Sequence, residues 1–67
     1  MHFKEIVFLI KNRRETLKIT QETLAELAGI GLRTLKQIER GKGNPTIKTI
    51  HKISDVLGLE LQLVVKK

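Results

Sequence analysis

Apolar residues recur at helical spacing near the start of the chain. In residues 3 to 17 they fall mostly at three- and four-residue intervals, as between Phe3 and Ile10, with charged residues between them. This pattern predicts an amphipathic helix. Phe8 and Leu9 widen the apolar stripe beyond one face. We therefore expect part of this helix to be buried on two sides or presented to a partner.

Two short helices are predicted next. Thr20 is placed to cap a helix over residues 21 to 28, and Gly29 follows where a left-handed residue usually ends a helix. Gly31 is the expected cap of a third helix over residues 32 to 40. The side chains expected to face inward are Leu24, Leu27, Ile30, Leu35 and Ile38. Those expected to face outward are Arg33, Lys36, Gln37 and Arg40.

A turn-rich loop over residues 41 to 45 precedes a fourth predicted helix. Thr46 is placed to cap this helix, and Gly58 to end it. Its apolar residues recur at three and four positions, which predicts one buried face. They are Ile47, Ile50, Ile53, Val56 and Leu57.

After Gly58 the apolar period changes to two, which predicts a β-strand. A single strand in a helical chain has no backbone partner within its own fold, and unpaired backbone groups are costly. We therefore expect it to pair with the same strand of a second copy across a two-fold axis. The expected dimerisation residues are Leu59, Leu61, Leu63 and Val65, with Lys66 and Lys67 guarding the strand edge.

Composition narrows the class of protein. The chain has 67 residues, no cysteine and a net charge of +6, which indicates one small domain without disulfides. Its apolar runs are too short to span a bilayer or act as a signal peptide, so we expect a soluble cytoplasmic protein. The basic charge fits a nucleic-acid partner, and it equally fits a merely solvated basic surface.

Two short helices joined by a tight turn predict a helix-turn-helix, whose second helix lies in the major groove of DNA. Residues 20–30, with Thr-Gln at the start and Ala-Gly-Ile at the turn, resemble the Cro/repressor-type (Xre) helix-turn-helix family. The Glu-Arg-Gly-Lys run of residues 39–42 and the Asn-Pro-Thr run of residues 44–46 follow at the family's spacing. The resemblance covers about residues 5 to 58.

The resemblance implies roles for individual residues. Leu32, Arg33 and Gln37 match base-reading positions, with Lys36 the next candidate. Arg33 suits guanine and Gln37 suits adenine, whereas Leu32 can only press on a thymine methyl. Gln21 is implied to contact a phosphate and to brace the next helix. The other residues expected to contact or lie near the phosphate backbone are Arg40, Gly41, Lys42 and Asn44.

Three further positions are singled out by the resemblance. Arg14 and Glu39 match residues that form an ion pair between the first and third helices. Lys18 stands where the family usually has glycine, so the bend there is expected to be strained by up to ~1 kcal/mol.

The fold expected is therefore all-α, a four-helix lambda-repressor-like domain over residues 1–58, with a dimerisation strand and basic end over residues 59–67. Size and the terminal strand also resemble small HipB-type antitoxins. In that subgroup the dimer represses its own operon and binds a HipA-like kinase-fold toxin.

Several hypotheses about the function stay open. We expect a homodimeric repressor on a palindromic double-stranded DNA operator, with a toxin partner if the subgroup resemblance holds. The alternatives are a protein-interaction module that neutralises a toxin, with DNA binding secondary, and a phage-type repressor without a toxin. No enzyme, cofactor or membrane is expected. No metal site is expected, because His2 and His51 stand isolated.

Overall fold

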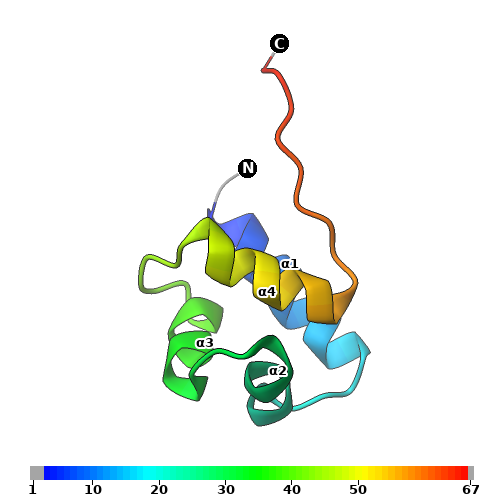
Figure 1. Cartoon of the computed structure of the whole chain (residues 1–67), viewed down its shortest axis with the longest axis vertical. Coiled ribbons are helices and arrows are strands. Elements are labelled where there is room, and N and C mark those ends of the chain that lie inside the picture. The colour runs from blue at the N-terminus through cyan, green and yellow to red at the C-terminus, as the bar shows by residue number, and fades with distance from the viewer. Residues whose placement is uncertain (1–2, 67) are drawn as a thin grey trace.

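The computed structural model describes residues 3–66 and places four α-helices in them (Figure 1). They are α1 (Phe3–Thr16), α2 (Gln21–Ala28), α3 (Leu32–Glu39) and α4 (Ile47–Leu57). The expectations for His2 and Lys67 concern residues outside this described part. The third helix ends one residue earlier than predicted, because Arg40 serves as its C-terminal cap. None of the helices in residues 3–66 combines the length and apolarity needed to cross a membrane.

Local hydrogen bonds explain where α2 and α4 begin. The Thr20 hydroxyl accepts from the Thr23 amide at 3.0 Å, and the Thr46 hydroxyl accepts from the Thr49 amide at 3.1 Å. Both bonds satisfy an amide that has no partner within the helix. At the other end of α2, Gly29 has a φ of 70°, a left-handed conformation that glycine adopts without a steric penalty. The predicted caps are therefore confirmed.

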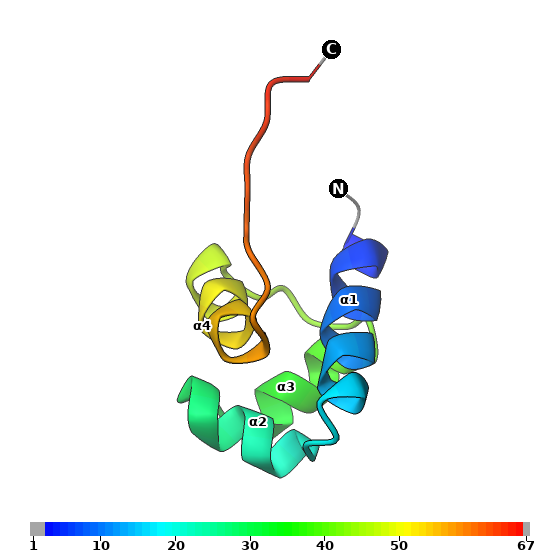
Figure 2. The same ribbon diagram turned by 90° about the vertical axis from the view of Figure 1, so that its right-hand side faces the viewer.

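The four helices enclose one small core. Helix α2 packs on α3 and α4, and α1 packs on the same two helices. Figure 2 shows α1 and α4 side by side, with α2 and α3 together at one end of the body. The side chains that are fully buried are Ile10, Leu24, Leu35, Ile38, Ile53 and Leu57.

Two residues predicted to face inward are exposed instead. Leu27 is 63% exposed, because the buried side of α2 is formed by Leu24, Ala25 and Ala28. At about 100° per residue, Leu27 falls roughly 100° away from the middle of that side. Ile47 is 70% exposed, since it begins α4 and lines an open groove rather than the core.

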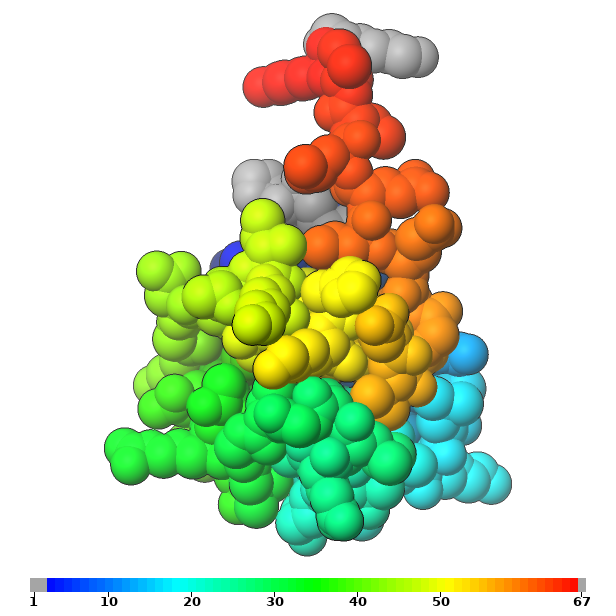
Figure 3. Space-filling model, viewed as in Figure 1, coloured from blue at the N-terminus to red at the C-terminus, as the bar shows by residue number. Residues whose placement is uncertain are grey.

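The chain after α4 leaves the body as an extended segment. Leu59 still packs against the core, whereas Leu63 is 95% and Val65 is 92% exposed. Figures 1 and 3 show this segment projecting beyond the body, at the end opposite α2 and α3. Residues 59–66 make no strand pairing within the described chain, so the dimerisation strand stays a prediction.

Candidate nucleic-acid interface

Helix α3 is divided lengthwise into a buried and a solvent-facing side. Leu35, Ile38 and Glu39 are buried, whereas Arg33 and Gln37 are exposed. The two exposed residues are one helical turn apart and therefore lie on the same face. Helices α1 and α2 both pack against α3, so its exposed face is held on a rigid support. A helix that recognises a DNA sequence requires such a support.

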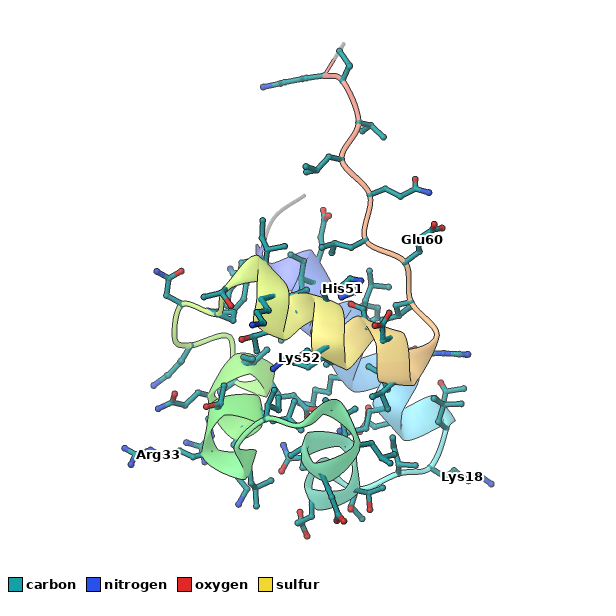
Figure 4. The ribbon with its side chains drawn as sticks, in the orientation of Figure 1. Lys18, Arg33, His51, Lys52 and Glu60 are labelled. Carbon is teal, nitrogen blue, oxygen red and sulfur yellow. The ribbon has the colours of Figure 1, made fainter. Side chains whose placement is uncertain are left out.

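The candidate base-reading residues lie together on this face. Leu32, Arg33, Lys36, Gln37 and Arg40 line one shallow polar hollow. Figure 4 shows Arg33 extending away from the body. Leu32 differs from the others because it is partly buried and packs against the core. Arg33, Lys36 and Gln37 thus have more of their side chains free for contact with a base than Leu32 has.

A bidentate ion pair fixes α3 to α1. Arg14 Nε donates to Glu39 Oε2 at 2.8 Å, and Arg14 Nη2 donates to Glu39 Oε1 at 2.9 Å. The Glu39 side chain is only 2% exposed, so its charge depends on this partner. The hydrogen bond with Glu39 raises the pKa of Arg14 above its ordinary value, although burial opposes the shift. Because the pKa of Arg14 is raised, the ion pair stabilises the fold fully at every pH below the pKa of an unfolded arginine. This range includes physiological pH.

Gln21 completes the connection among three helices. Its Nε2 donates to Glu39 Oε1 at 3.1 Å. The first residue of α2 is thereby joined to the last residue of α3 through a carboxylate that α1 also holds. This contact is the bracing implied for Gln21, and it commits one donor of the side-chain amide.

The loop after α3 offers fewer phosphate donors than expected. The Gly41 amide donates to Ile38 O at 2.9 Å, and the Lys42 amide donates to Gln37 O, also at 2.9 Å. These two amides are therefore already used to close the end of α3. Lys42 and Asn44 are exposed and lie with Gln37 around one small hollow, so their side chains stay candidate donors to a phosphate.

Sequence reasoning missed two residues of α1. Lys11 lies with Arg14, Gln21, Lys36 and Arg40 around a polar hollow beside α3. Its position three residues before Arg14 places both on one side of the helix, a spacing that could have identified it.

Arg13 of α1 was also missed by the sequence analysis. Its Nε donates to Leu57 O at 2.8 Å, which caps the carbonyl end of α4 with a cation. No signal in the sequence joins residues so far apart.

The helix-turn-helix family HTH_3 matches residues 10–64 of this chain. An uncharacterized HTH-type transcriptional regulator of Methanothermobacter thermautotrophicus is 38% identical over 52 residues, covering 78% of this chain and 75% of that protein. The immunity repressor protein of Bacillus phage phi105 is 36% identical over 56 residues, which cover 84% of this chain and 39% of the repressor. The cryptic phage CTXphi transcriptional repressor RstR of Vibrio cholerae is 35% identical over 52 residues, 78% of this chain and 46% of RstR.

The chain thus spans less than half the length of these two phage repressors and three quarters of the archaeal regulator. The match to the family covers α2, the turn and α3, and α3 carries the exposed basic face. The chain therefore belongs to the Xre-type helix-turn-helix family of DNA-binding transcriptional regulators.

Proposed function

We propose that this protein is a sequence-specific repressor that binds a palindromic double-stranded DNA operator as a homodimer and blocks the promoter. The observation that carries the proposal is the exposed face of α3, where Arg33 and Gln37 lie one turn apart beside Lys36 and Arg40. Arginine pairs bidentately with guanine, and glutamine pairs in the same way with adenine. The surrounding cations supply attraction to any sequence.

The backbone contacts lie on both sides of α3 in this proposal. Lys42 and Asn44 bind phosphates on the loop side, and Gln21 lies at the opposite side with Arg40. Such contacts fix the register of the helix in the groove without reading sequence. Arg33 and Gln37 then carry the discrimination between operator and other DNA.

Dimerisation through the C-terminal segment is the second part of the proposal. Leu63 and Val65 are almost fully exposed, and burying them against a second copy removes that apolar surface from water. Antiparallel pairing also satisfies the backbone groups of this segment. Because it projects at the end opposite α2 and α3 (Figure 1), pairing there leaves the face of α3 free for DNA.

The test is a salt titration of binding to DNA from the protein's own promoter and to a scrambled duplex of equal composition. We expect tighter binding to the promoter, with both affinities falling steeply as salt rises. Sedimentation at the same concentrations reports whether the bound species is a dimer. Equal weak binding to both duplexes would leave only a basic helical domain and would refute a sequence-specific repressor.

A toxin-binding antitoxin is the alternative function that the sequence suggests. Two neighbouring apolar residues of α1 are exposed, Phe8 at 65% and Leu9 at 43%, and they favour a protein contact on this helix. The deciding observation is the neighbouring gene and its product. A co-purifying kinase-fold protein encoded beside this chain would favour the antitoxin, whereas a phage lysogeny region would favour a phage-type repressor.

A further inference from the structure

The polar hollow that contains Lys11 is a basic pocket, which lies where α1, α2 and α3 meet. Four cationic side chains line it, together with one amide and one carboxylate, in a volume of about 390 Å³. Its lining residues are Lys11, Arg14, Gln21, Lys36, Glu39 and Arg40. The residues come from three helices, so the pocket is a product of the tertiary fold rather than of one charged segment.

The charge that this pocket presents to solvent is positive. Its one carboxylate, Glu39, is buried and accepts from Arg14 with both oxygens, and Gln21 donates to one of them. Glu39 is therefore satisfied within the protein and offers little attraction to the other cations. Lys11, Lys36 and Arg40 are exposed and form no ion pair with a carboxylate in residues 3–66. The site consequently favours an anion.

The position of the pocket identifies the anion. Lys36 and Arg40 line this pocket and also the hollow that contains Arg33 and Gln37. The loop hollow with Lys42 and Asn44 touches α3 at Gln37 and Ile38. A helix inserted in the major groove has a DNA backbone along each side. The pocket on the α1 side is thus placed beside one backbone, as the loop is beside the other.

We infer that this pocket binds one phosphate of the DNA backbone and that Lys11, on α1, is one of the charged residues that hold it. The inference rests on the proposed function, in which α3 enters the groove. It also reassigns part of the phosphate role implied for Gln21. The Gln21 amide is engaged with Glu39 and carries no net charge, whereas the Lys11 ammonium is exposed and mobile enough to reach a phosphate.

The first experiment compares Lys11→Gln with wild type by fluorescence anisotropy on the promoter duplex and on the scrambled duplex. A matched control is Lys18→Gln, which removes the same charge from a side chain that points away from Arg33 (Figure 4). Losing one phosphate contact should lower affinity about five-fold at 0.15 M salt and reduce the salt slope by about 0.9. We expect this loss on both duplexes for Lys11→Gln, little change for Lys18→Gln, and recovery in Lys11→Arg.

The second experiment identifies the phosphate. Single neutral methylphosphonate linkages are placed in turn along the promoter duplex. Wild type should lose more affinity than Lys11→Gln at one linkage in each half-site, because the variant has already lost one of the contacts to that phosphate. Thermal melting of the variant checks that it is folded.

The outcomes separate this inference from the proposed function. Equal effects of Lys11→Gln and Lys18→Gln, with promoter preference intact, would overturn the phosphate site and leave the repressor standing. An identical methylphosphonate pattern in wild type and Lys11→Gln would also overturn it, since the pocket would then hold a free anion or none. Equal binding of the wild-type protein to the promoter duplex and the scrambled duplex would instead refute the proposed function.

Discussion

Arg14 of α1 holds Glu39, the last residue of α3, through two hydrogen bonds of 2.8 and 2.9 Å. The same carboxylate accepts from Gln21 at the start of α2. The orientation of α3 therefore depends on a charge that is almost completely buried. This contact leaves the exposed side of α3 free, yet it helps to fix where Arg33 and Gln37 lie.

Substituting Glu39→Gln should destabilise the protein by about 3 kcal/mol, because it leaves the Arg14 guanidinium without its counter-charge in a partly buried site. Urea unfolding followed by circular dichroism measures this change. The paired replacement Arg14→Met with Glu39→Met should lose much less than the sum of the two single changes. A cost below about 0.5 kcal/mol for Glu39→Gln would show that the pair is no more than a surface contact.

Substituting Arg33→Ala should weaken operator binding by about 1–3 kcal/mol and relax preference at one base pair. Gln37→Ala should act in the same way at a different base pair. Lys42→Ala serves as the control, since a phosphate contact should weaken all sequences alike. Binding to a set of singly substituted operators measures the pattern. Uniform losses for all three variants would mean that the base-reading residues lie elsewhere.

Lys18 has a φ of 57°, a left-handed conformation that costs a non-glycine residue about 1–2 kcal/mol. Lys18→Gly should therefore stabilise the fold by about 0.5–1 kcal/mol, after the added entropy of the unfolded chain is subtracted. For a domain of this size the melting temperature should rise by roughly 2–8 °C. Lys18→Ala, which needs the same conformation, should give no such rise, and an equal rise in both variants would contradict the strain.

The proposed dimer is tested on its apolar strand face. Leu63→Lys places a charge among residues expected to be buried between two copies, so sedimentation should show a shift toward monomer. Operator affinity should fall with it, while half-site affinity should stay within about two-fold. Gln62→Lys adds the same charge on the other side of the segment and should leave the dimer intact. A dimer that resists Leu63→Lys would require another interface.

Arg13 donates from α1 to the Leu57 carbonyl at the end of α4. Arg13→Met keeps most of the aliphatic packing but removes this charge-assisted bond, so it should cost about 1.5 kcal/mol of stability. Thermal unfolding measures the loss, and Lys48→Met on the exposed side of α4 provides the control. If the two variants melt together, the contact adds nothing to stability.

Much of the fold was predictable because its signals are local. Thr20 and Thr46 cap helices through bonds to residues three positions away, and Gly29 ends α2 by its own backbone conformation. Leu27 and Ile47 were predicted wrongly, although they fit an apolar period. Their exposure depends on which neighbouring helices reach that part of α2 or α4, and a period alone carries no such information.

Some features of the candidate site were also predictable from local sequence, whereas others depend on the packing of the helices. The exposed side of α3, with Arg33 and Gln37, follows from spacing along one helix, and the family resemblance paired Arg14 with Glu39. The junction of Lys11 with Lys36 and Arg40, and the use of the Gly41 amide within the turn, appear only once the helices are packed. Caps and helix faces depend on neighbours in sequence, whereas convergent charges depend on the angles at which separate helices meet.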